Sequence, residues 1–232
     1  FGISVELSTA YSLFIVGTTA LVGGIRNATL GNVNYKTLVV FTIPTFIAVY
    51  STRAYLLPAI PADILIIGDF LLTKDIAIMI FFALVMLAVS VSMVRDSRNE
   101  TEQTFDQPGP NFNVPAIIAE GAVVGVLTGI VGAGGGFLII PALVLFAKIS
   151  MKKAVGTSLL IIAAKSLIGF IGDVQRPDLE IDWNLLISVT AIAVVGIFTG
   201  IYLTKFIDGK KLKKGFGWFV LLMAVYIIGK QF

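Results

Sequence analysis

Long apolar stretches alternate with short polar ones along almost the whole chain. A helix needs about 20 apolar residues to cross a hydrocarbon core of about 30 Å. Six stretches meet this requirement, at residues 7–27, 35–57, 74–94, 151–173, 183–206 and 211–230. Residues 58–73, which contain Asp63 and Asp69, are too short and too acidic to predict another span. The pattern therefore predicts an all-α polytopic membrane protein.

A seventh apolar segment, residues 114–148, is too long for one span and carries glycines near its centre. As a single helix it would measure about 52 Å, which exceeds the thickness of a bilayer even with a generous tilt. The glycines of the sequence GAGGG are Gly132, Gly134, Gly135 and Gly136. Glycine weakens a helix, and a broken backbone at membrane depth is tolerated only beside protein or a water-filled cavity. We therefore expect two half-helices, arranged either as a re-entrant hairpin or as one span that unwinds.

A polar linker with proline and glycine, residues 95–113, divides the chain into two membrane regions. Residues 1–94 form the first predicted region, and residues 114–232 form the second. Residues 3–25 align without gaps to residues 149–171, each residue meeting the one 146 positions later. The identical positions are Ile3, Ser4, Ser12, Leu13, Ile15, Leu21, Gly23 and Ile25. The same order of elements follows in both regions, which favours two homologous repeats over similarity imposed by lipid.

The first repeat has no counterpart of residues 114–146 in this alignment. We therefore expect a chain truncated at its N-terminus, whose parent protein begins with another glycine-rich broken helix. The loop charges bear on how the repeats are oriented. If residues 114–148 cross the membrane once, lysines and arginines divide nearly evenly between its two sides; if the segment enters and leaves on one face, most of them gather on one side. The positive-inside rule favours the second arrangement, which is a pair of inverted repeats.

The composition supports a membrane protein and removes several kinds of chemistry. Hydrophobic residues make up 57% of the 232 residues and charged residues 13%, with a mean hydropathy of +0.96, whereas a soluble domain carries about 25% charged residues. The net charge of +3 is ascribed to cytoplasmic loops and not to a nucleic-acid partner. The chain has no cysteine or histidine, so it lacks thiolate chemistry and the commonest general base and metal ligand. We expect no cofactor, no metal site and no catalytic residues; an intramembrane enzyme is the weaker alternative.

Three features together resemble the TauE/SafE family of sulfite exporter-like permeases. They are the signature GxGGGxLxxPxLxL from Gly132 to Leu145, the TSL motif at residues 157–159 and the duplication. The resemblance covers essentially the whole chain. It implies a multi-pass protein of the prokaryotic inner membrane that moves sulfite, organosulfonates or related sulfur-containing anions. The first-half copy of the glycine signature is not in this chain, so half of a symmetric site is unassigned.

The glycine cluster is the predicted substrate-binding site. A half-helix that starts there presents unpaired N–H groups and the positive end of its dipole. Glycine lets this backbone approach an anion closely, and broken helices whose N-termini face anions near the midplane recur in transporters. Close helix packing by small residues is the alternative. The predicted binding residues are Gly132, Gly134, Gly135 and Gly136.

Polar side chains on two spans are predicted to complete the site. Lys165 lies within a span, where a charge is a functional candidate by default; it would pair with the anion or, if deprotonated by burial, couple transport to protons. The alternatives are a snorkelling lysine or an ion pair with Glu120, which is itself a candidate proton carrier. Ser158 and its repeat equivalent Ser12 are candidate hydroxyl donors, unless they bond to the preceding helical turn. Thr19 is the equivalent of Lys165 and completes the candidate set.

These observations predict a secondary transporter that works by alternating access between its repeats. Proton coupling is the preferred energy source, because the sequence lacks the GxxxxGK[ST] loop that binds ATP. A passive anion channel with the same site is the alternative. The expected partners are a small sulfur-containing anion, protons and membrane lipid, and the sequence assigns no oligomeric state.

Overall fold

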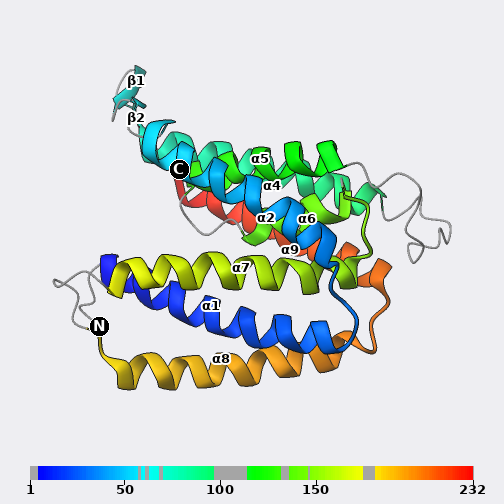
Figure 1. Cartoon of the computed structure of the whole chain (residues 1–232). Helices are drawn as coiled ribbons and strands as arrows, with labels where there is room; N and C mark the ends of the chain where they lie inside the picture. Colours follow the sequence, from blue (N-terminus) through cyan, green and yellow to red (C-terminus); the bar gives the residue numbers. More distant parts are fainter. Residues whose placement is uncertain are drawn as a thin grey trace. The chain divides into compact units, whose positions relative to one another are not determined.

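The computed structural model describes residues 5–56, 59–60, 63–67, 70–96, 114–131, 136–145, 147–174 and 181–231 (Figure 1). Its elements are α1 (Val5–Thr29), α2 (Tyr35–Ser51), η1 (Thr52–Leu56), β1 (Asp63–Ile67), β2 (Phe70–Thr73), α4 (Lys74–Asp96), α5 (Val114–Val131), α6 (Gly136–Leu145), α7 (Met151–Val174), α8 (Trp183–Thr204) and α9 (Gly209–Gln231). Most of the predicted polar linker, residues 97–113, lies outside the described residues.

The described residues contain six helices that are long and apolar enough to cross a membrane. These candidate spans are Leu7–Thr29, Tyr35–Leu56, Ile76–Arg95, Met151–Val174, Trp183–Thr204 and Gly209–Gly229. Each coincides with a span predicted from the sequence, and the ends differ by only a few residues. The prediction of a helical polytopic membrane protein is therefore confirmed.

Beside the helices, the described residues include one short pair of strands. Strands β1 and β2 pair antiparallel, with Asp63 opposite Thr73 and Ile67 opposite Phe70 (Figure 1). Residues 58–73 were excluded as a span, and no strand pair was predicted there, although their isoleucines favour strands. The hairpin leads directly into α4.

The chain folds as two compact units, each built from separated parts of the sequence. The first unit combines residues 1–38 with 152–208, and the second combines residues 39–151 with 209–232. Each unit therefore takes helices from both sides of the polar linker. The division predicted at the linker is based on sequence repeats, whereas these units are defined by contacts. The units therefore do not test that division, which stays a prediction.

In the first unit, α1 packs against α7 and α8 around an aromatic cluster. The rings of Phe14 and Phe170 lie with their centroids 4.9 Å apart, and Trp183 meets both rings edge-on at 6.2 and 6.4 Å. The Tyr11 hydroxyl accepts a hydrogen bond of 2.8 Å from the Asp182 N–H. The Asp182 carboxylate in turn accepts from the first N–H groups of α8, as an N-cap does. These contacts fix the start of α8 against α1.

Helices α1 and α7 are antiparallel and approach each other closely at glycines. Four contacts define their crossing: Leu13 with Gly169, Gly17 with Leu167, Gly23 with Leu159, and Gly24 with Leu160. From Leu13 to Gly24 of α1 the partner on α7 moves from residue 169 back to residues 159 and 160, which gives the antiparallel direction. Two contacts exchange roles under the repeat alignment, because Leu13 aligns with Leu159 and Gly23 with Gly169. A two-fold relation between the helices requires such reciprocal contacts.

In the second unit, α4 packs along α9. Met86 of α4 and Val220 and Ala224 of α9 form a buried core between the two helices. The Ser90 hydroxyl donates a hydrogen bond of 2.7 Å to the main-chain oxygen of Gly217. Because Ser90 is near the end of α4 and Gly217 near the start of α9, these two ends lie side by side.

Candidate anion site

In the long apolar segment the structure describes two helices, one on each side of residues 132–135, where a break was predicted. Helix α5 ends at Val131 and α6 begins at Gly136 (Figure 1). Gly136 is thus the first residue of α6, whereas Gly132, Gly134 and Gly135 lie outside the described residues. The ten residues of α6 measure about 15 Å, half of what a span needs. Helix α6 contacts both α5 and α4.

The start of α6 combines a helix N-terminus with an apolar, buried setting. Leu138 and Ile139 of its first turn are buried, with 4% and 0% of their surface exposed. No acidic residue is present in this first turn, so no side chain of its own helix offsets the positive end of the dipole. The first four N–H groups of a helix have no partner within it. This arrangement can receive an anion through the main chain.

Glu120 on α5 carries a buried polar atom without a partner. Its Oε2 atom has no hydrogen-bond donor among the described residues. A carboxylate oxygen that is held away from both water and donors is costly while it is charged. Glu120 therefore has the surroundings expected of a group that takes up a proton.

A glycine stripe on α5 (Gly121, Gly125 and Gly129) was not recognised in the sequence analysis. A Cβ atom at any of the three would come within 3 Å of atoms in α2 or η1. The Thr45 hydroxyl donates a hydrogen bond of 3.0 Å to the oxygen of Gly121 across this contact. The signal was present as glycines spaced by four, a pattern typical of closely packed membrane helices. The stripe holds α5 against α2, and so supports the helix that precedes the break.

Lys165 and Thr19 lie near the centre of the α1–α7 crossing. Contacts between these helices run over residues 13–24 of α1 and residues 159–170 of α7, and the midpoints of both ranges fall beside Thr19 and Lys165. The Thr19 hydroxyl donates a hydrogen bond of 2.6 Å to the oxygen of Ile15 in its own helix. Lys165 is half-buried. The two equivalent positions therefore lie at the same level of the first unit.

The two candidate serines differ in their surroundings. Ser158 is fully buried, and its hydroxyl donates a hydrogen bond of 2.9 Å to the oxygen of Val155. This is the bond to the preceding turn that was weighed as the alternative to ligand binding. Ser12 is exposed. Ser12, Thr19, Ser158 and Lys165 all belong to the contacting helices α1 and α7, whereas Gly136 and Glu120 belong to the second unit.

The remaining residues of the TSL region attach the α1–α2 connection to α7, which the sequence did not predict. The Asn34 N–H donates a hydrogen bond of 3.0 Å to the hydroxyl oxygen of Thr157. The main-chain oxygen of Asn32 packs directly on Gly156, where a Cβ atom would overlap with it. The Asn27 oxygen accepts a hydrogen bond of 2.9 Å from the Asn32 N–H. Thr157 is therefore a positioning residue in the described structure.

Comparisons with known proteins agree with the membrane architecture. The family model described as "Sulfite exporter TauE/SafE" matches residues 1–227. A probable membrane transporter protein of Xylella fastidiosa is 29% identical over 232 positions, covering 97% of this chain and 81% of the relative. Probable membrane transporter proteins of Methanocaldococcus jannaschii and Bacillus subtilis are 34% and 31% identical over 120 and 110 residues. These two matches cover 49% and 47% of this chain and 44% of each relative. No solved structure matches significantly.

Proposed function

The chain belongs to the sulfite exporter TauE/SafE family, and from this premise we propose that it transports sulfite, an organosulfonate or a related sulfur-containing anion. It is a multi-pass membrane transporter of the prokaryotic inner membrane. One observation carries the anion proposal: a short buried helix, α6, starts within an apolar segment at a glycine and has no acid in its first turn. Such a start offers donors to a negative solute without placing a second charge in the membrane.

Alternating access between inverted repeats is the proposed mechanism. It is supported by the antiparallel crossing of α1 and α7 and by the reciprocal Gly–Leu contacts within it. If both helices cross the membrane, an antiparallel pair of equivalent helices has its two-fold axis in the membrane plane. Inverted repeats have this axis, and transporters of this kind bind substrate near it.

Proton coupling is proposed as the energy source, with Glu120 as the first candidate and Lys165 as the second. The unpartnered Oε2 atom of Glu120 supports this role. A carrier that binds an anion together with a proton moves less net charge than one that binds the anion alone. A passive anion channel through the same site is the competing function.

Uptake of radiolabelled sulfite into proteoliposomes distinguishes these functions. A proton-coupled carrier should accumulate sulfite against its own gradient when a proton gradient is imposed, and a protonophore should abolish the accumulation. The anion recovered should be unchanged in ion chromatography, since no catalysed step is proposed. Strictly downhill flux that ignores the proton gradient would favour the channel.

The equivalence of Thr19 and Lys165 gives a sharper test of the site. Replacing Lys165 with threonine should lower sulfite flux by at least tenfold, because the only charge proposed at the crossing is lost. The double variant Thr19→Lys/Lys165→Thr should recover a substantial part of the flux if the lysine acts from the centre of a two-fold relation. Lys152→Thr, near the start of the same helix, is the matched control and should transport normally. Normal flux in Lys165→Thr would remove Lys165 from the mechanism.

A further inference from the structure

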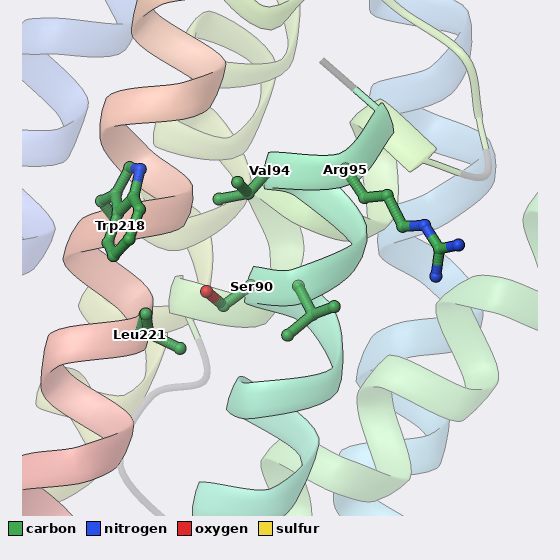
Figure 2. Close-up of a pocket in the computed structure, with 6 residues that line it drawn as sticks. Ser90, Val94, Arg95, Trp218 and Leu221 are labelled. Carbon is green, nitrogen blue, oxygen red and sulfur yellow. The ribbon is translucent and has the colours of Figure 1, made fainter. Parts of the chain in front are cut away.

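The surface of the second unit contains a groove that the proposed transport mechanism does not use. It has a volume of about 370 Å³ and is lined by Ser90, Val91, Val94, Arg95, Trp218 and Leu221. Figure 2 shows Trp218 and Leu221 extending from α9, with Ser90 and Val94 on the facing side of α4. The Ser90 hydroxyl is already engaged by the oxygen of Gly217. The groove therefore offers an occupant mainly apolar surface.

The groove ends where positive charge gathers. Arg95 lies in the last turn of α4 and lines the groove, and its guanidinium points to the side of α4 away from Trp218 (Figure 2). The first two turns of α9, at the same end of the pair, carry the exposed Lys210, Lys211 and Lys214, whereas Lys213 is buried. Lys214 precedes Trp218 by one helical turn and shares its face. This face carries Lys214, then Trp218, then Leu221. The order of charged, aromatic and apolar side chains matches the order of headgroup, interface and acyl chain in a lipid layer.

We propose that this groove binds one anionic glycerophospholipid. Its acyl chain lies along Val91, Val94 and Leu221, and its phosphate is held by Arg95 and Lys214. The Arg95 guanidinium in Figure 2 lies on the side of α4 away from Trp218, and its long flexible stem lets it swing toward a phosphate at the groove's end.

Charge complementarity selects lipid over a second copy of the chain. A two-fold partner in a membrane presents its own cationic end at the same depth, so the basic ends of both α4–α9 pairs would face each other. An anionic headgroup instead neutralises them. Trp218 is 55% exposed and Val91 54% exposed, so an acyl chain has access to the apolar part of the groove. This inference does not depend on which anion is transported.

Tryptophan fluorescence provides the test, because the chain has only two tryptophans, Trp183 and Trp218. The variant Trp183→Phe leaves Trp218 as the reporter. It is reconstituted in phosphatidylcholine vesicles that contain an equal small fraction of acyl-brominated phosphatidylglycerol or acyl-brominated phosphatidylcholine. We expect phosphatidylglycerol to quench Trp218 more strongly, with a preference of about fivefold for each basic residue that holds the phosphate. The variant Trp218→Phe, which reports from Trp183 in the first unit, should show no preference.

Charge variants identify the headgroup site. Arg95→Gln and Lys214→Gln should each lower the preference for phosphatidylglycerol about fivefold. Arg26→Gln removes the basic residue from the last turn of α1 and is the matched control, which should keep the preference. Equal quenching of Trp218 by the two lipids would overturn the proposal. This comparison uses the Trp183→Phe protein alone, so it does not depend on whether the charge variants fold. A loss of preference as large in Arg26→Gln, or weak quenching by both lipids as when a second copy covers Trp218, would also overturn it.

Discussion

Replacing Gly156 with alanine should destabilise the first unit, although alanine is ordinarily the better helix former. Gly156 lies in the second turn of α7, directly beneath the α1–α2 connection. An alanine Cβ would overlap with the main-chain oxygen of Asn32 and come within 3.0 Å of the Asn27 Cβ. The substitution therefore sets a favourable helix propensity against a clash with backbone.

The size of this destabilisation depends on how firmly the α1–α2 connection is held. The Asn32 N–H donates to Asn27, and the Asn34 N–H donates to Thr157, so hydrogen bonds fix the connection on both sides of the clash. A methyl group forced into a packed site costs about 1–3 kcal/mol, and a backbone neighbour that cannot rotate away favours the upper end. The better helix propensity of alanine offsets about 1 kcal/mol of this cost. The expected net loss in the free energy of unfolding is about 2 kcal/mol.

The matched control is Gly172→Ala on the same helix, where a Cβ atom has no neighbour within 4 Å. This change should stabilise the protein by up to about 1 kcal/mol. Both variants are unfolded with sodium dodecyl sulfate in mixed micelles, and the loss of helical circular dichroism is followed to equilibrium. The packing argument fails if Gly156→Ala is as stable as the unmodified chain, or if the two alanine variants shift stability in the same direction.

Two further substitutions are tested by the same unfolding measurement. Lys148 has a left-handed backbone conformation, with φ of 50°, so Lys148→Gly should raise the free energy of unfolding by up to about 1 kcal/mol, whereas Lys152→Gly within α7 should lower it by about 1 kcal/mol. Ser90→Ala should cost about 1 kcal/mol because it removes the buried hydrogen bond from α4 to the oxygen of Gly217. The exposed Ser188 bonds only to its own helix, so Ser188→Ala should change stability by less than about 0.5 kcal/mol, and an equal effect of the two serine variants would contradict the role of the Gly217 bond.

The sequence predicted the spans well because a bilayer imposes one length and one polarity on every helix that crosses it. The ends of all six spans fall near the predicted ones for this reason. The sequence also predicted a break at the glycine cluster, because four glycines cannot continue an apolar helix without cost. Residues 132–135 lie outside the described residues, so this break stays a prediction. The hairpin at residues 63–73 was missed, since a run of that length was considered only as a possible span.

Contacts between helices were harder to predict than the helices themselves. A lipid-facing surface and a helix-packing surface are made of the same apolar residue types. The sequence therefore did not indicate that α4 packs along α9, or that each compact unit combines helices from both sides of the linker. Glycine spacing was the exception. The four-residue spacing of Gly121, Gly125 and Gly129 indicated the close contact with α2. It was not recognised, because the glycine cluster at residues 132–136 was interpreted as a binding site and the spacing before it was not considered.

The hydrogen bonds within the spans limit which hydroxyl groups can donate a hydrogen bond to an anion. The hydroxyls of Thr19, Ser158 and Thr190 each donate to a main-chain oxygen of their own helix, so their protons are already used. A hydroxyl engaged in this way can accept a hydrogen bond but cannot donate to a negative solute. A helix start has the opposite property, because its first N–H groups lack partners within the helix. This contrast favours the start of α6 over the hydroxyls of Thr19 and Ser158 as a donor to an anion.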